Sequence, residues 1–238
     1  MREHVRGWVA GAVLAAACGG GSEAKPAAAP RVPVESTTVA AAPATAGARV
    51  LIVGTSLTAG LGLEPDSAYP AVLQRLADSS GYQVTNVAQG LSGETSAGAL
   101  RRLDWILSCE KPAVIVIETG ANDGLRGLRV DSTKANLVSI VRKVRAALPQ
   151  SRVLLAQMEA PPNLGQQYTR DFHNAFLDVA RDEQVNLIPF FLDRIAGVPA
   201  LNQDDGIHPN EEGARRAARN VWKTLGPVLQ DVPGVLKR

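Results

Sequence analysis

From Arg49 onward, short apolar runs alternate with stretches in which apolar residues recur at helical spacing. Short runs of branched apolar residues are typical of buried strands, and apolar residues three or four positions apart are typical of one helix face. The pattern predicts strands over residues 49–53, 82–88, 113–119, 152–158 and 185–190. It predicts helices near residues 69–79, 95–108, 132–147, 169–183 and 211–226.

The alternation of strands and helices indicates the α/β fold class. Strands that are separated by helices pair in parallel through right-handed crossovers, which place helices on both faces of the sheet. The run at 113–119, "AVIVIET", suits a central strand that is covered on both sides. Ligands of such sheets bind at the carboxyl ends of the strands, where the strand order reverses. Candidate site residues are therefore those that directly follow each predicted strand.

The first 18 residues have the pattern of a secretory signal. A short head with Arg2 and Arg6 precedes the apolar stretch "WVAGAVLAAAC", which ends at Cys18. A basic head, an apolar run and small residues before a cleavage site define a signal peptide. The run is too short to span a bilayer, which needs ~20 apolar residues. We therefore expect this segment to be removed on export.

The end of this segment resembles the lipobox of bacterial lipoproteins, in which cleavage leaves a lipid-bearing cysteine as the first residue. The lipobox leucine normally lies three residues before the cysteine, where this chain has Ala15, and Leu14 lies one position earlier. The resemblance implies lipidation of Cys18 and a membrane tether on the periplasmic or outer-membrane side of the cell envelope. The alternative is an ordinary signal peptide cut nearby, which leaves Cys18 as an incidental thiol on a soluble periplasmic or secreted protein.

Residues 19–48 mix Gly, Pro, Ala, Ser and Thr without helical or strand periodicity. Such a segment buries too little apolar surface to offset its ordering entropy, so we interpret it as a disordered tether. Residues 49–238 then form one folded domain, because the 238-residue chain is too short for two ordinary domains with linkers.

Composition narrows the range of partners. The formal net charge is +2 and aromatic residues make up 4% of the chain, so we expect neither a phosphate-binding surface nor a stacking platform for bases. Nucleic acid is excluded as a partner on this basis. Cys109 ends a helical pattern, and we expect it to be a small buried apolar residue rather than a catalytic thiol.

Residues with catalytic chemistry follow four of the predicted strands. They are Ser56 after the first, Gly90 and Gly93 after the second, Asn122 and Asp123 after the third, and Asp204, Asp205 and His208 after the fifth. A serine attacks an acyl carbon when a base accepts its proton, and imidazole does so at neutral pH. Of the three histidines, His4 lies in the predicted signal and His173 lies off the apolar face of its helix. His208 is therefore the candidate base for Ser56.

An acid and a set of oxyanion donors complete the hypothesis. Asp205 lies three residues before His208, a spacing that lets its carboxylate reach one imidazole nitrogen, and Asp204 is the competing candidate. The Ser56 and Gly93 amides and the Asn122 side chain could donate to an oxyanion. Each is ambiguous alone, because Gly93 could be an ordinary turn residue and Asn122 could build an Asx-turn. Ser56 by itself could equally be the cap of the following helix.

Residues 49–228 resemble the SGNH, or GDSL-type, hydrolases, and in particular their bacterial arylesterase, lysophospholipase and acyl-CoA thioesterase I-like branch. The similar stretches are "GTSLTAGLGL", "NVAQGLSGETSAGALRRL", "ETGANDGLRGL", "PFFLD" and "DDGIHPN". The resemblance implies a three-layer α/β/α, flavodoxin-like fold with a central parallel sheet of about five strands. It also implies Ser56 as nucleophile, Asp205 and His208 as its triad partners, an oxyanion hole of Ser56, Gly93 and Asn122, and no metal or organic cofactor.

Thr55 departs from the family pattern, because it stands where the family name has aspartate. The sequence therefore does not determine which hydrogen bonds hold the serine loop. We expect threonine in place of aspartate to have modest effects on the rate of catalysis or on its pH dependence. The expected activity is hydrolysis of small esters or thioesters with short or medium acyl chains by a monomer. The alternatives are deacetylation of cell-envelope polysaccharide at the same site and a non-catalytic, lipid-tethered binding domain.

Overall fold

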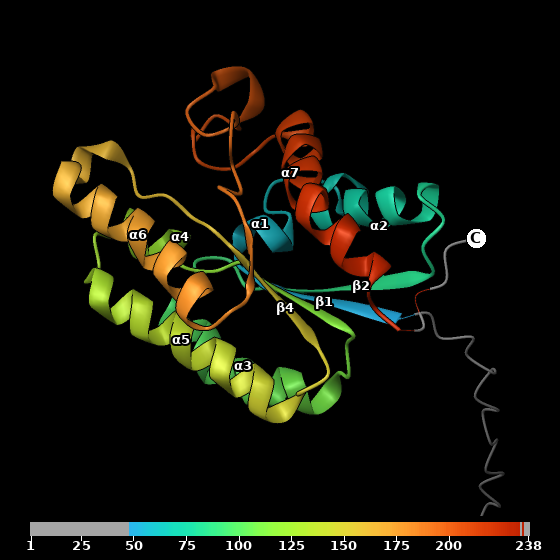
Figure 1. The fold of residues 1–238 in the computed structure, drawn as a ribbon. Helices are drawn as coiled ribbons and strands as arrows, with labels where there is room; N and C mark the ends of the chain where they lie inside the picture. The colour runs from blue at the N-terminus through green and yellow to red at the C-terminus, as the bar shows by residue number, and fades with distance from the viewer. Residues whose placement is uncertain (1–47, 234, 236–238) are drawn as a thin grey trace, which may run out of the picture. The chain divides into compact units, whose positions relative to one another are not determined.

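The computed structural model describes residues 48–233 and residue 235. Five parallel strands form one sheet in the order β2-β1-β3-β4-β5 (Figure 1). They are β1 (Ala48–Gly54), β2 (Val84–Gly90), β3 (Val114–Ile117), β4 (Arg152–Ala156) and β5 (Asn186–Ile188). This is the flavodoxin-like order, in which the direction of winding reverses between β1 and β3. The predicted sheet is confirmed. β1 starts one residue earlier than expected, β2 lies two residues later, and β3, β4 and β5 are shorter than the predicted strands.

Helices cover both faces of the sheet, as predicted (Figure 1). On one face α2 (Tyr69–Ser79) packs against α7 (Glu211–Gln230), and on the other α5 (Val130–Ala147) packs against both α3 (Ser96–Cys109) and α6 (Gln166–Asp182). These five helices are amphipathic: α6, for example, buries Phe172, Phe176 and Val179 toward the sheet. The helix expected to end at residue 226 continues through Pro227, because Leu225 and Leu229 stay buried on the same face.

The core lies around the two central strands. Residues 50–53 of β1 and 114–117 of β3 are each at most 1% exposed, so neither of these stretches has a solvent-facing side. Their branched side chains fit a strand that is covered on both faces. The short helices α1 (Ser56–Ala59) and α4 (Ala121–Leu125), which the periodicity did not predict, follow β1 and β3 at the carboxyl edge.

The predicted N-terminal segments precede the part of the chain that the structure describes. The predicted signal peptide, Cys18 and residues 19–47 of the predicted tether lie outside the described residues. Among the residues that are described, no helix combines the length and the apolar character needed to cross a membrane.

The predicted burial of Cys109 is wrong: its thiol is exposed, because it is the last residue of α3 and lies where the chain leaves the helix for β3. With Ala48 and Arg152 it lines a hollow at the amino ends of the strands, the edge opposite Ser56.

Candidate active site

Ser56 lies where β1 ends and α1 begins. The strand ends at Gly54, Thr55 is the residue before the helix, and Ser56 is its first residue. The turn is so tight that a Cβ on Gly54 would lie 1.9 Å from the Thr58 hydroxyl oxygen. A Cβ on Gly90 of β2 would lie 2.2 Å from the backbone nitrogen of Ala59. Both glycines are therefore needed for α1 to sit directly on the ends of β1 and β2.

The structure brings Ser56, His208 and Asp205 together in a hydrogen-bonded chain. The Nε2 atom of His208 lies 2.9 Å from Ser56 Oγ, and its Nδ1 atom lies 2.5 Å from an Asp205 carboxylate oxygen. The Ser56 residue is 7% exposed and the His208 side chain 18%, so the contact between them is largely shielded from water. The imidazole thus has one nitrogen on the serine and the other on the carboxylate.

A tight turn holds Asp205 in place. Its second carboxylate oxygen accepts hydrogen bonds from the backbone amides of Ile207 and His208, each at 2.9 Å. Gly206, which follows Asp205 in the turn, has a positive φ of 68°. The hydrogen bond with the imidazole of His208, followed by these two amides, lowers the pKa of Asp205 to about 2. Both candidate acids are exposed, and it is Asp205 that the imidazole contacts.

Gly93 lies in the loop after β2, and Asn122 lies in α4 at the same edge of the sheet. The Nδ2 atom of Asn122 donates to the backbone carbonyl of Glu94 at 3.0 Å, and Arg126 donates to the carbonyl of Gly93 at 2.8 Å. Gly93 has a φ of 76°, a conformation that favours glycine. Asn122 of α4 and Arg126, the residue directly after that helix, therefore hold the loop that carries Gly93. This brings the second and third predicted oxyanion donors into one local structure.

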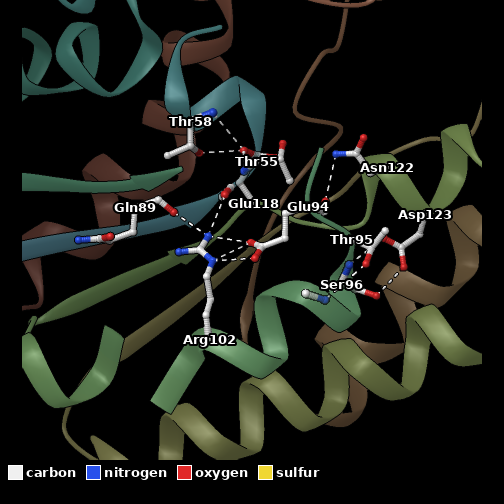
Figure 2. Close-up of polar contacts among 12 residues, drawn as sticks. Thr55, Thr58, Gln89, Glu94, Thr95, Ser96, Arg102, Glu118, Asn122 and Asp123 are labelled. Atoms are coloured by element: carbon white, nitrogen blue, oxygen red, sulfur yellow. Dashed lines mark hydrogen bonds and ion pairs between the residues drawn. The ribbon is translucent and has the colours of Figure 1, made fainter. Parts of the chain in front are cut away.

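Buried charges support this loop from behind (Figure 2). Arg102 of α3 forms a two-pronged ion pair with Glu94, and it also donates to the carbonyls of Gly54 and Gln89 at 3.1 and 2.8 Å. Asp123 accepts hydrogen bonds from the backbone amide and hydroxyl of Ser96, at 2.8 and 2.5 Å. The ends of β1 and β2 and the starts of α3 and α4 are thus tied together beneath the site.

Comparison with known proteins identifies the family of this chain. The sequence profile of the GDSL-like Lipase/Acylhydrolase family matches residues 52–216, a range that contains the candidate triad and oxyanion-hole residues. The chain belongs to this family. It is accordingly an acylhydrolase of the esterase type, and the resemblance seen in its motifs is confirmed.

Individual relatives match over most of the folded part of this acylhydrolase. It is 43% identical to Esterase TesA of Pseudomonas aeruginosa over 180 residues, which cover 76% of this chain and 89% of that protein. It is 35% identical to thioesterase 1/protease 1/lysophospholipase L1 of Escherichia coli over 186 residues, which cover 78% of this chain and 87% of that protein. The crystal structure of the psychrotrophic esterase EstA from Pseudoalteromonas superposes with a TM-score of 0.72 at 35% identity, covering 76% and 98% of the two chains.

The structure of the acylhydrolase also adds Glu118, a residue that the sequence reasoning passed over. Its buried carboxylate accepts four hydrogen bonds, from the backbone amides and hydroxyls of Thr55 and Thr58, at 2.8 to 3.3 Å. Burial raises the pKa of Glu118 to about 7, and the four hydrogen bonds oppose that rise. The sequence did contain a sign of this role, because Glu118 directly follows an apolar strand. A carboxylate buried at such a position needs several hydrogen-bond donors or an opposite charge beside it.

A small apolar pocket adjoins the catalytic edge. Ser56 and His208 line it together with Leu57, Leu61, Leu63, Tyr69 and Phe191 and residues of α7. Its volume is about 10 Å³, which is close to the room that one water molecule needs. A long acyl chain does not fit inside this pocket as it stands.

Proposed function

We propose that this protein hydrolyses carboxylic esters or thioesters through an acyl-enzyme on Ser56, with His208 as general base and Asp205 as the acid that orients it. One observation carries the proposal: the continuous chain from Ser56 Oγ through both imidazole nitrogens to Asp205, at 2.9 and 2.5 Å. A hydroxyl becomes an effective nucleophile when an adjacent base is itself held by a third group.

The reaction follows from this chain in two halves. In the first, Ser56 Oγ bonds to the acyl carbon while its proton passes to His208 Nε2. The bond to the leaving group then breaks, and the leaving alcohol or thiol takes that proton. In the second half, water gives a proton to His208 and attacks the acyl carbon. The bond to Ser56 Oγ breaks, the proton returns to Ser56, and the carboxylic acid leaves. Asp205 stays ionised throughout and stabilises the imidazolium.

The tetrahedral intermediates need donors for their oxyanion. We assign this role to the amides of Ser56 and Gly93 and to the side chain of Asn122. The Asn122 amide nitrogen carries two hydrogens, and its bond to the Glu94 carbonyl uses one of them. That bond fixes the orientation of the amide and leaves the second hydrogen for the substrate. Such preorganised donors are worth roughly 2.7–4 kcal/mol each in related chemistry.

The substrate class is proposed from the pocket and from the relatives. The small space beside Ser56 favours short acyl groups, and longer chains would have to lie over the exposed side chains of Leu61 and Ile207 near the site. The relatives are named as esterase, arylesterase and thioesterase. We therefore propose small aryl or alkyl esters and thioesters with short to medium acyl chains as substrates of a monomeric enzyme.

The test compares hydrolysis by wild type, Ser56→Ala and His208→Ala, with His173→Ala as the matched histidine control. The substrates are p-nitrophenyl esters of increasing chain length, acyl-CoA thioesters and acetylated glycans. We expect wild type and His173→Ala to cleave the short esters and to be labelled by a fluorophosphonate probe, and both other variants to lose turnover. Equal activity in all four proteins would contradict the mechanism. Activity confined to acetylated glycans would contradict the proposed substrates and indicate a polysaccharide deacetylase instead.

We also propose that the protein is exported and carries a lipid on Cys18. The support is the N-terminal sequence, in which a basic head and an apolar run lead into a cysteine. The mass of the mature N-terminal peptide tests this proposal, with Cys18→Ser as control. A diacylated Cys18 in the membrane fraction is the expected result. An unmodified peptide that starts elsewhere, in the soluble fraction, would indicate an ordinary signal peptide.

A further inference from the structure

Glu118 lies directly beneath the turn that presents Ser56. Its backbone amide donates to the carbonyl of Val53 in β1 at 2.8 Å, so its side chain is placed beside the end of that strand. From there one carboxylate oxygen accepts the Thr55 hydroxyl at 2.9 Å. The other accepts the Thr55 amide at 2.9 Å, the Thr58 hydroxyl at 2.8 Å and the Thr58 amide at 3.3 Å (Figure 2). Glu118 therefore holds the residues on both sides of Ser56.

The surroundings of Glu118 suit a carboxylate rather than a neutral acid. The two Thr55 and Thr58 amides can only donate, and the two hydroxyls complete a set of four donors. The Tyr69 hydroxyl lies 2.7 Å from the Thr58 hydroxyl, so Tyr69 can donate to Thr58 while Thr58 donates to Glu118. A protonated Glu118 would need an acceptor where donors already point, and the Thr55 or Thr58 hydroxyl would have to turn away.

The turn that carries Ser56 depends on such outside support. Helix α1 has four residues, and the side chain of Thr55 makes no capping bond to it. Within the turn, the amides of Ala59 and Leu61 bond back to the carbonyls of Thr55 and Ser56 at 2.9 and 3.0 Å. A helix this short is not stable by itself, because its nucleation cost exceeds what so few bonds return. The direction of Ser56 Oγ toward His208 is thus set by what lies under α1.

We propose that Glu118 is a positioning residue for the nucleophile: through Thr55 and Thr58 its carboxylate holds α1 in the orientation that points Ser56 Oγ at His208. The inference rests on the function proposed above and deepens it. It also gives Thr55 a role. Thr55 stands where the family name has aspartate, and here the carboxylate comes from Glu118, the residue directly after β3, and reaches the turn through the Thr55 hydroxyl and amide.

Protonation of Glu118 should therefore weaken catalysis. Burial raises the pKa of Glu118 to about 7, so the carboxylate forms as the pH rises through neutrality. The groups that face it are Thr55 and Thr58 of the serine turn and Tyr69 of α2, whose own pKa is raised by burial and by the charge of Glu118. Arg102 of α3 contacts the neighbouring Gly54 carbonyl, but its charge is paired with Glu94.

The test uses Glu118→Gln, which keeps the shape and removes the charge, and the pair Thr55→Val and Thr55→Ser, which removes or keeps the hydroxyl. Thr119→Val is the matched control, because the buried Thr119 hydroxyl has no hydrogen-bond partner within the described residues. For each protein, kcat and KM for a short p-nitrophenyl ester are measured from pH 5 to 9. The concentration of active sites used to calculate kcat is determined by titration with a fluorophosphonate. The rate of labelling by that probe is recorded alongside.

We expect Glu118→Gln to lower kcat and the labelling rate by about 10- to 100-fold at pH 8, with KM changed less than twofold. Thr55→Val should show a smaller loss that Thr55→Ser restores, and Thr119→Val should match wild type. The acid limb of kcat/KM should be steeper in wild type than in Glu118→Gln, because protonation of Glu118 weakens catalysis only where the carboxyl group is present.

Two results would overturn the inference. One is a Glu118→Gln protein whose kcat per titrated site and acid limb equal those of wild type. The other is a loss that disappears once rates are divided by titrated sites, since that would mean that Glu118 affects only the folded fraction. Failure of the proposed function looks different, because the wild-type protein itself would then show neither turnover nor labelling.

Discussion

Replacing Arg102 with leucine tests whether the charges behind the site hold it together. The guanidinium pairs with Glu94, whose side chain is 4% exposed. It also donates hydrogen bonds to the backbone carbonyls of Gly54 at the end of β1 and Gln89 near the end of β2. Leucine keeps part of the apolar stem and removes all five donors of the guanidinium. The substitution therefore leaves a buried carboxylate without its counter-charge and releases the ends of two strands.

The size of the effect follows from the burial of the pair. Removing one partner of a buried ion pair costs ~3–5 kcal/mol, because the other charge stays behind unpaired. The Arg102 side chain is 19% exposed, so water reaches the pair and the lower end of that range applies. We expect the free energy of unfolding to fall by about 3 kcal/mol. For a domain of this size that corresponds to a loss of roughly 6–12 °C in Tm.

Urea denaturation of wild type, Arg102→Leu, Glu94→Gln and the double variant measures the loss and the coupling. The double variant should be more stable than Arg102→Leu, because it buries no unpaired charge. The control is Arg101→Leu, on the exposed side of the same helix, with a change within about 0.5 kcal/mol. A loss below 1 kcal/mol for Arg102→Leu, or a double variant less stable than it, would refute this account.

Three further predictions concern the site itself. Asn122→Ala should lower kcat on the order of 10²- to 10³-fold with little change in KM, which steady-state kinetics of ester hydrolysis would show. Gly54→Ala should reduce both the melting temperature and the labelling rate, because its Cβ would lie 1.9 Å from the Thr58 hydroxyl oxygen; an unchanged Tm would mean that the turn can shift. Asp205→Asn should lower kcat on the order of 10⁴-fold. The pKa of Asp205 is depressed to about 2, so the stability it contributes is present above its ordinary pKa of 3.8 and is lost as the pH falls toward 2. Acid unfolding of Asp205→Asn should lack that component and would be followed by circular dichroism.

Much of the architecture could be read from the pattern of apolar residues. Runs such as residues 114–117 have no polar side because both faces of a central strand are covered, and that leaves a strong signal in the sequence. Helix α6 was also predictable, since Phe172, Phe176 and Val179 recur on one face. Short elements such as α4 escaped, because a helix of five residues completes too few turns to show a period.

The candidate site could be assembled only in outline. Ser56 and His208 were singled out because parallel strands end at one edge, so residues that follow different strands meet there. The spacing to His208 and the family resemblance both favour Asp205 over Asp204, and the turn at Gly206 explains how Asp205 reaches the imidazole. Cys109 was misjudged, because apolar periodicity does not show that the last residue of a helix already faces solvent.

By itself, the sequence determined the order of strands and helices, the edge of the sheet that carries chemistry, and the family to which the motifs belong. These depend on local periodicity and on residues near in the chain. Only the tertiary structure decided how Ser56 is held. The contact of Ser56 with His208 joins residues 152 positions apart, and that of Thr55 with Glu118 joins residues 63 apart. A buried charge is stable only beside the donors that the fold brings to it, so Glu118, Glu94 and Arg102 acquire their roles from packing and not from pattern.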